Sequence, residues 1–178
     1  MVIEVSQMTM AASDPKSREL IQTVSQISNG LMGEVAKVII GKQENLRRVA
    51  IGILSNANML IEDYPGLAKT LMANTFATSL GCKFKRVQFT PDLLPADIMG
   101  TYMYDQQAGE FKLRPGPLFT NVLLADEINR APPKTQAALL EAMEEKQVTI
   151  EGITHKLPAP FITMAVSYTH LRAHETGY

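Results

Sequence analysis

The sequence predicts a three-layer α/β fold, in which helices cover both faces of a parallel sheet. Residues 59–61 and 121–125 form two short, almost purely apolar runs, as expected for strands that are buried on both faces. Patterns of helical spacing occupy residues 69–80 and 135–146, downstream of these runs. Strands that alternate with helices along a chain are typical of a parallel sheet.

Size, charge and cysteine content narrow the classes of protein. A chain of 178 residues suffices for one core, and its formal charge of -1 gives no bulk attraction for nucleic acid. The single cysteine, Cys82, excludes a disulfide framework and a thiolate metal cluster. The first ten residues do not resemble a signal peptide, and no apolar run approaches the roughly 20 residues that a membrane span needs. We therefore expect a cytoplasmic protein without a membrane span.

The first third of the chain predicts a tail to about Ala12 and then two helices. Ser13 and Asp14 can cap a helix over residues 13–35, and Pro15 suits its first turn. Apolar residues recur in it at helical spacing: Leu20, Ile21, Val24, Ile27 and Leu31. After Gly41, a second helix would carry Leu46, Val49, Ile51 and Leu54.

The middle of the chain predicts a strand at residues 59–61, a tight loop, and a helix over residues 69–80 that Gly81 ends. A strand at residues 84–89 follows. Residues 90–120 are rich in proline and glycine, and we expect an insertion there with a small hairpin around Gly109.

The last third predicts a helix, a hairpin and a strand. The helix over residues 135–146 has Ala137, Leu140, Ala142 and Met143 as candidate core positions. Apolar and polar residues alternate around Gly152, which predicts a hairpin, and residues 161–165 would form a further core strand.

The loop after the first strand partly matches the phosphate-binding pattern GxxxxGK(S/T), in which backbone amides, a lysine and a hydroxyl surround phosphate and its metal. The matching window is Asp63-Tyr64-Pro65-Gly66-Leu67-Ala68-Lys69-Thr70. Its first and sixth positions are Asp63 and Ala68 in place of glycine. Taken alone, the window is equally compatible with an ordinary turn between a strand and a helix.

Two adjacent carboxylates, Asp126 and Glu127, follow the second apolar run. In sites of phosphoryl transfer, one such carboxylate holds Mg²⁺ and the other orients or activates the attacking water. The pair would lie at the carboxyl end of a central strand, where open parallel sheets bind their ligands. We therefore predict Asp126 and Thr70 as metal ligands, and Glu127 and Lys69 as catalytic residues, with ATP and Mg²⁺ as cofactors. The alternative is a solvated turn after a strand.

The sequence resembles the MoxR family of AAA+ ATPases over about residues 35–165. Four blocks carry the resemblance: residues 62–70, residues 86–98 (RVQFTPDLLPADI), residues 114–117 (RPGP) and residues 126–136 (DEINRAPPKTQ). The resemblance implies a P-loop NTPase core with a helix-2 insertion at residues 98–119 and a hairpin before the sensor strand at residues 147–157. It also implies that residues 38–41 line the adenine pocket. The predicted nucleotide-binding residues are Ile39, Ile40, Gly41, Asp63, Pro65, Gly66, Leu67, Ala68, Lys69, Thr70 and Leu71.

The resemblance further implies an assembly and a cellular role. Members of the family form homo-hexameric rings, remodel a protein client and work with a von Willebrand A domain partner. In related rings, the insertion and the hairpin face the pore or the partner.

The resemblance ends after residue 165. We expect residues 1–34 to form the N-terminal tail and helix, residues 35–165 a partial nucleotide-binding core, and residues 166–178 a non-native tail that resembles translated adapter sequence. The polar sensor, the trans-acting arginine and the C-terminal helical lid of the family would then be absent. Because an arginine finger accelerates hydrolysis by about a thousandfold or more, we expect weak nucleotide binding and little turnover.

Two other functions compete with an ATP-driven motor acting on proteins. A nucleic-acid motor or loader would need a basic face with stacking aromatics, which the near-neutral, aromatic-poor composition does not favour. A nucleotide-binding module without hydrolysis would follow if Asp63 repels triphosphate. Lys85 and Arg86 predict a solvated strand edge, and His155 a surface residue that binds no metal.

Overall fold

A computed structural model describes residues 14–62 and 69–167 of the chain. Its helices are α2 (Pro15–Ala36), α3 (Gln43–Leu54), α4 (Lys69–Ser79), α5 (Pro95–Met99), α6 (Pro133–Glu145) and the 3-10 turn η1 (Ile128–Arg130). Its strands are β1 (Met59–Glu62), β2 (Phe84–Gln88), β3 (Gly100–Asp105), β4 (Glu110–Pro115), β5 (Val122–Asp126), β6 (Gln147–Ile150), β7 (Ile153–Lys156) and β8 (Ile162–Ser167).

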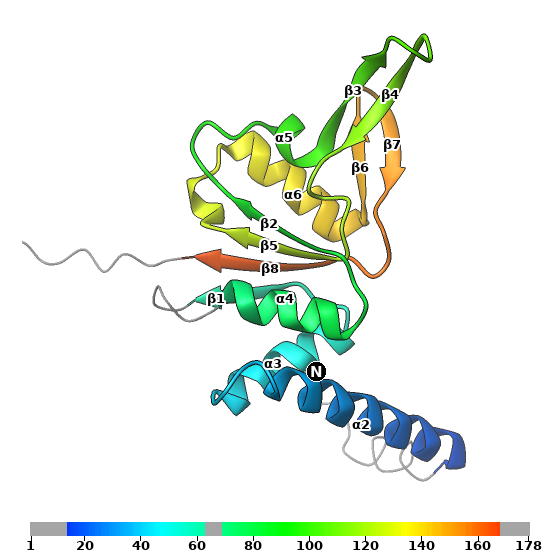
Figure 1. Ribbon diagram of the computed structural model, residues 1–178, viewed down its shortest axis with the longest axis vertical. Helices are drawn as coiled ribbons and strands as arrows, with labels where there is room; N and C mark the ends of the chain where they lie inside the picture. Colours follow the sequence, from blue (N-terminus) through cyan, green and yellow to red (C-terminus); the bar gives the residue numbers. More distant parts are fainter. Residues whose placement is uncertain (1–13, 63–68, 168–178) are drawn as a thin grey trace, which may run out of the picture.

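Four strands form a parallel sheet in the order β1-β8-β5-β2. Figure 1 shows α2, α3 and α4 on one side of the molecule and α5, α6 and the small hairpins on the other. The predicted three-layer α/β fold with a parallel sheet is confirmed, and β5 and β8 are its inner strands.

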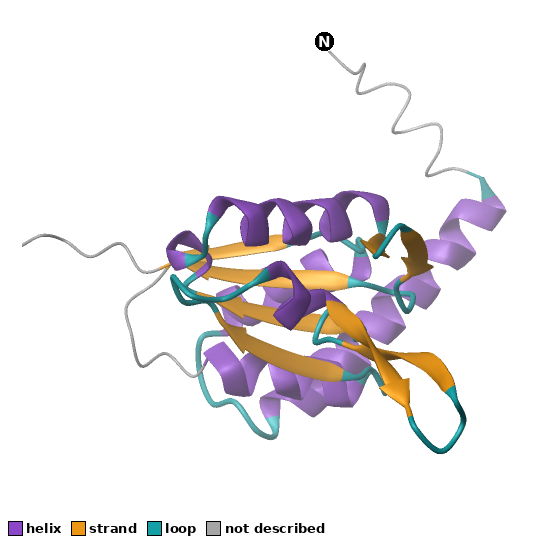
Figure 2. Cartoon of the chain, turned by 90° about the horizontal axis from the view of Figure 1, so that it is seen from above, coloured by secondary structure: helices purple, strands orange, loops and turns teal. Residues whose placement is uncertain are grey.

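Strand β5 separates the two halves of the core because successive side chains of a strand point to opposite faces. Val122 and Leu124 are buried with side chains of α2, α3 and α4. Leu123 and Ala125 are buried with side chains of α6 and the hairpins. The view from above in Figure 2 shows the orange strands with purple helices on both sides. All five residues of β5 are buried, as the apolar run predicts.

Helix α2 begins and ends within a residue or two of its predicted limits, but its apolar residues divide into two groups. Leu31 and Val35 are buried in the core. The four residues that precede them are at least 46% exposed: Leu20, Ile21, Val24 and Ile27. The first half of the helix extends past the sheet, at the lower right of Figure 1. Helical spacing therefore predicted the helix correctly, whereas burial depends on how far the core reaches.

The predicted core face of α6 was partly wrong. Ala137 and Leu140 are exposed, Met143 is half-buried, and only Ala142 of the four candidates is buried. The buried positions are Thr135, Leu139 and Ala142, whose spacing of four and then three residues forms a single helical stripe. Thr135 can lie in that stripe because its hydroxyl donates a hydrogen bond to the Leu93 carbonyl at 2.7 Å.

Strand β8 continues past the predicted boundary at residue 165. Val166 is 1% exposed and pairs with Asp126 on one side and Ile61 on the other, and Ser167 pairs with Glu62. Leaving residues 166 and 167 out of the fold was therefore wrong, because an apolar side chain at position 166 fills a core position. The remainder of the predicted tail, residues 168–178, lies outside the described residues.

Both predicted hairpins are present, and they contact each other. The Tyr102 hydroxyl in β3 lies 3.1 Å from Nε2 of His155 in β7, and the Phe119 ring packs edge-on to His155 at 6.4 Å. The second hairpin is joined in turn to the central sheet, because Lys146 Nζ donates to the Phe161 carbonyl at 3.1 Å. His155, expected at the surface, is half-buried by these contacts.

Glycine is required where the first hairpin leaves the core. Gly100 has φ +98°, and a Cβ there would lie 2.3 Å from the Arg114 carbonyl oxygen. Gly109, at the hairpin turn, has φ +70° and open space around it. The two positions therefore share an unfavourable φ for other residues and differ in steric room.

We expect Gly100→Ala to lower the free energy of unfolding by about 3 kcal/mol or more, because it adds a backbone clash to a strain of about 1 to 3 kcal/mol. Gly109→Ala, the matched control, should show the strain alone. Urea denaturation followed by circular dichroism measures both. Equal losses for the two variants would contradict the close contact at Gly100.

Within residues 14–62 and 69–167, none of the helices combines the length and the apolar character needed to cross a bilayer.

Candidate nucleotide site

The predicted site residues gather at the carboxyl end of the parallel sheet. Strand β1 ends at Glu62 opposite Ser167, and β5 ends at Asp126 opposite Val166, so the two strands finish at the same edge. Only β8 lies between them, which puts the ends of β1 and β5 about 10 Å apart at the usual strand spacing. Helix α4 begins at Lys69, and Figure 1 shows the start of this helix at the edge of the sheet to which the strands point.

Asp126 shares a face of the sheet with helix α4. Strand alternation puts its side chain on the same face as Val122 and Leu124, which pack against Ala73 and Phe76 of that helix. The residue is 5% exposed, so a carboxylate is buried beside the helix that carries Lys69. A buried charge of this kind requires a counter-charge.

The two oxygens of the Asp126 carboxylate have different surroundings. Oδ2 accepts a hydrogen bond from Nη2 of Arg86, which completes an ion pair of 2.6 Å. Oδ1 is buried and finds no hydrogen-bond partner among the described residues. Buried polar atoms are rarely left without a partner, so Oδ1 marks a place for a cation or a donor.

Glu127 lies where the chain leaves the sheet. It has φ +55°, an uncommon value outside glycine, and so turns sharply from β5 into the turn η1. Its carboxylate pairs with the Arg130 guanidinium in the same turn. The Gln136 side chain fixes the turn by donating to the carbonyls of Ile128 and Ala131, at 3.2 and 3.0 Å.

The first residues of α4 differ in exposure. Lys69 is 7% exposed, whereas Thr70 is exposed and Leu71 is 46% exposed. The remaining predicted loop residues lie outside the described part of the chain: Asp63, Pro65, Gly66, Leu67 and Ala68.

The segment predicted to contact adenine connects α2 with α3. Ile39 is half-buried against the core, and Ile40 is 94% exposed. Gly41 has φ +84° and precedes Lys42, which also has a positive φ. An isoleucine with almost its whole side chain bare offers apolar surface to a flat ring.

Two arginines of this site were not identified from the sequence. Arg86 was expected at a solvated strand edge, and the structure instead pairs it with Asp126, although its side chain is still 45% exposed. Arg130 had no predicted role. The signal for Arg86 is the register of β2 against β5, since Gln88 lies opposite Asp126 and Arg86 is on the same face as Gln88. Short-range sequence patterns do not contain that register.

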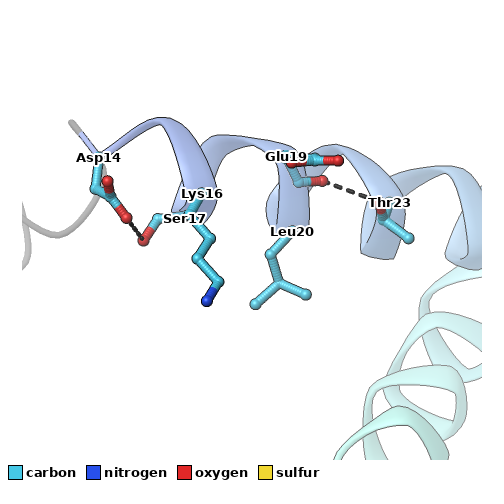
Figure 3. Close-up of a pocket in the computed structure, with 6 residues that line it drawn as sticks. All are labelled: Asp14, Lys16, Ser17, Glu19, Leu20 and Thr23. Atoms are coloured by element: carbon cyan, nitrogen blue, oxygen red, sulfur yellow. Dashed lines mark hydrogen bonds between the residues drawn. The ribbon is translucent and has the colours of Figure 1, made fainter.

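Two pockets lie along α2, and neither is lined by the predicted site residues Lys69, Asp126 or Glu127. One, of about 420 Å³, is lined by residues of a single helix and its cap, including Asp14, Lys16 and Glu19. Figure 3 shows that its hydrogen bonds stay within the helix: Ser17 Oγ donates to Asp14, and Thr23 Oγ1 donates to the Glu19 carbonyl. The other, of about 580 Å³, lies between exposed apolar residues of α2 and α3, among them Leu20, Val24 and Ile51.

Comparison with known proteins decides the family. Residues 58–171 match the family described as "ATPase family associated with various cellular activities (AAA)". The chain belongs to this AAA family. The match spans β1, α4, β5 and β8, and therefore every described element that carries Lys69, Asp126 or Glu127.

Similar proteins confirm the MoxR resemblance within the AAA family. Chaperone MoxR1 of Mycobacterium tuberculosis is 51% identical over 132 residues, which are 74% of this chain and 35% of that protein. An uncharacterized protein of Bacillus subtilis, YeaC, is 49% identical over 131 residues, or 74% of this chain and 41% of the relative. Protein MoxR of Methylorubrum extorquens is 30% identical over 130 residues, or 70% and 38%.

A solved structure shares the fold. A protein from Cytophaga hutchinsonii is 42% identical with a TM-score of 0.75, and the match covers 89% of this chain and 49% of that one. The AAA chain thus spans about half of this structural relative and between 35% and 41% of the curated relatives named above.

Proposed function

We propose that this chain is the ATP-binding core of a MoxR-like AAA+ ATPase. In its longer form, the protein would couple ATP hydrolysis to chaperone-like remodelling or maturation of protein complexes. The observation that carries the proposal is the buried carboxylate of Asp126, which has one oxygen without a hydrogen-bond partner among the described residues, at the sheet edge where α4 begins with Lys69. Family membership supports nucleotide as the ligand.

The donor atoms of the site suit Mg²⁺. Asp126 Oδ1 and the Thr70 hydroxyl are oxygen ligands of the kind that Mg²⁺ prefers, and Oδ1 has no hydrogen-bond partner within residues 14–62 and 69–167. Groups of three His, Cys, Asp or Glu side chains suited to a metal do not occur in the described part of the chain. Magnesium is commonly held by one or two protein oxygens together with phosphates and water. A magnesium site of this kind does not need a cluster of three metal-binding side chains. Bound Mg²⁺ would neutralise charge on the phosphate oxygens.

The chain's own residues divide the remaining tasks. Lys69 would donate to the terminal phosphates of ATP, and residues 63–71 would surround them with backbone amides. Glu127 would accept a proton from the water that attacks the γ-phosphorus, while the bond from that phosphorus to the bridging oxygen breaks and ADP leaves. Ile39, Ile40 and Gly41 would contact adenine, with the bare side chain of Ile40 against the ring.

The ion pair between Glu127 and Arg130 bears on this chemistry, because the guanidinium occupies the carboxylate that would accept the proton. Glu127 would therefore have to exchange Arg130 for water before it acts. In a ring, contact with a neighbouring subunit could supply that exchange.

We expect Glu127→Gln, in a form extended to the length of the relatives, to keep ATP binding and to lose at least about a hundredfold in hydrolysis rate. The reason is that an amide cannot accept the proton of the attacking water, and general-base catalysis contributes about a hundredfold or more. Phosphate release under saturating ATP measures the effect. An unchanged rate would exclude Glu127 as the base.

The proposal as a whole is tested by titrating the chain with a fluorescent ATP analogue, with and without Mg²⁺. Binding that strengthens with Mg²⁺ is expected. Binding that ignores Mg²⁺ would favour a nucleotide-binding module without hydrolysis, and no binding would refute the nucleotide site in this chain.

The assembly and the partners belong to the longer protein. We propose a homo-hexamer that acts on a protein client together with a von Willebrand A domain protein, with no role for nucleic acid. The tip of the first hairpin supports a contact with protein, because Tyr104 and Phe111 are 56% and 69% exposed and pack edge-to-face at 5.3 Å. The ion pair of Asp105 with Lys112, at 2.8 Å, fixes the tip and holds the pKa of Asp105 below its usual value.

We also propose that the protein is cytoplasmic. We further propose that the chain divides into segments after residues 34 and 165. The free thiol of Cys82 is compatible with a reducing compartment. The boundary at residue 165 is a prediction from the point where the family resemblance ends, and β8 itself continues to Ser167.

A further inference from the structure

Arg86 reaches the candidate site from the strand next to Asp126. Strands β2 and β5 pair in parallel, with Gln88 opposite Asp126 and Arg86 two residues earlier on the same face. Nη2 of Arg86 contacts two acceptors, Asp126 Oδ2 at 2.6 Å and Gln88 Oε1 at 3.0 Å. One nitrogen of the guanidinium thus donates to both neighbouring side chains.

The hydrogen bond from Arg86 makes the two carboxylate oxygens of Asp126 different: one is bound to the arginine and the other is not. The side chain of Asp126 is 7% exposed, so its orientation depends on protein contacts more than on water. Oδ2 is bound by the guanidinium, and that contact fixes the rotation of the carboxylate about its last bond. Oδ1 is buried, has no hydrogen-bond partner in the described part of the chain, and is the oxygen that remains for a ligand.

The backbone supports the same orientation. The Phe89 amide donates to the Asp126 carbonyl at 2.8 Å, which continues the β2–β5 ladder one residue beyond the strands. The Phe89 side chain is fully buried, so the end of β2 is anchored next to Arg86. Asp126 in β5 and Arg86 in β2 are therefore both carried by strands that the hydrogen-bonded sheet holds in place.

We propose that Arg86 is a positioning residue for the cation of the bound nucleotide: by holding Oδ2 of Asp126, it directs Oδ1 at Mg²⁺. This inference rests on the proposed function, in which Asp126 is a magnesium ligand. Residues that orient a metal ligand through a hydrogen bond typically change metal affinity by about 10- to 100-fold when they are removed.

The positive charge of Arg86 can also act on ATP directly, and this effect depends on Mg²⁺ in the opposite way. The Arg86 side chain is 45% exposed, so its charge would also attract the phosphates of ATP directly. Direct attraction is strongest for ATP without Mg²⁺, which carries more negative charge. Loss of direct attraction alone would weaken binding most without Mg²⁺, whereas loss of positioning weakens it most with Mg²⁺.

The test measures the dissociation constant of a fluorescent ATP analogue with and without Mg²⁺, using the full 178-residue chain. The ratio of the two constants is the benefit that Mg²⁺ gives to binding. In Arg86→Gln, we expect this benefit to fall by about tenfold or more. In Arg86→Lys, which keeps the charge but loses the planar guanidinium, we expect a partial fall.

Control variants separate the possible outcomes. Arg48→Gln removes an arginine from an exposed pair with Glu44 on α3, far along the chain from the site, and should leave the benefit of Mg²⁺ unchanged. Asp126→Asn should abolish the benefit. A loss of structure in Arg86→Gln would weaken binding equally with and without Mg²⁺, and Arg86→Lys then provides the measurement.

The results also distinguish this inference from the proposed function. If Asp126→Asn loses the benefit of Mg²⁺ while both Arg86 variants retain it in full, the role of Arg86 is overturned and the magnesium site stands. If the benefit grows in Arg86→Gln, the guanidinium competes with the cation, and positioning is likewise overturned. If the wild-type chain gains nothing from Mg²⁺, both the inference and the proposed magnesium site are refuted.

Discussion

Replacing Lys69 with alanine is expected to weaken binding of an ATP analogue by about tenfold to a hundredfold. The charged hydrogen bonds that a lysine gives to phosphate contribute about 1.5 to 3 kcal/mol, and each 1.4 kcal/mol is a factor of ten. Lys69 is buried at the first position of α4, and it is the only lysine in the predicted phosphate loop, residues 63–70. A fluorescence titration in Mg²⁺ measures the change.

A matched lysine variant supplies the control for Lys69→Ala. Lys156 is exposed on β7, at the second hairpin, and its replacement removes the same charge away from the predicted loop. Lys156→Ala should bind as the wild type does. Equal affinities for Lys69→Ala and the wild type would remove Lys69 from the site and leave the phosphate loop without its central cation.

The second large effect concerns stability. Phe89→Ala should lower the free energy of unfolding by about 3 to 5 kcal/mol, because it removes a fully buried aromatic side chain and leaves a cavity. Folded domains are stable by only about 5 to 15 kcal/mol, so this loss is a large share of the total. Urea unfolding, with the midpoint and slope fitted together, measures it.

Phe111→Ala is the matched control for Phe89→Ala. Phe111 is 69% exposed, and its one aromatic partner in the hairpin is Tyr104, so we expect a loss of no more than about 1.5 kcal/mol. A smaller loss for Phe89→Ala than for Phe111→Ala would contradict the assignment of Phe89 to the core. Because the Phe89 amide is bonded to the Asp126 carbonyl, partial loss of structure there should also weaken nucleotide binding.

Elements of the fold could be predicted from the sequence where local pattern and tertiary packing agree. The run that became β5 is apolar at every position but its last, and a buried inner strand requires that composition. Glycine at positions 109 and 152 marked both hairpin turns, since each has a positive φ. Each of these signals is contained in one residue or a few consecutive ones, so it can be read from a single sequence.

Burial was predicted less well because it depends on which other elements are near. Leu140 has the apolar character of a core residue, but the stripe of α6 that faces the sheet runs through Leu139. Leu20 and Ile21 have the spacing of a buried helical face, but the first half of α2 extends past the sheet. The direction of each helix relative to the sheet decides these cases.

The candidate site shows the same division. Asp126 and Glu127 could be predicted because two carboxylates follow an apolar strand directly. The pairing of Arg86 with Asp126 could not, since it joins residues 40 positions apart and depends on the parallel register of β2 and β5. Arg130 lies three residues from Glu127, and their contact forms across a turn that begins with the positive φ of Glu127, which the sequence does not reveal.

The contact between Tyr102 and His155 connects the two hairpins, so a force applied to one of them can be transmitted to the other. A load applied to the tip of the first hairpin at Tyr104 would pass along β3 to Tyr102 and across to His155 in β7. From β7 it would reach Lys146 through the Leu157 amide, and then the start of β8 through the Phe161 carbonyl. Strand β8 runs between β1 and β5 to the edge where Lys69 and Asp126 lie. A force on the first hairpin would therefore be transmitted along β8 to the predicted nucleotide site.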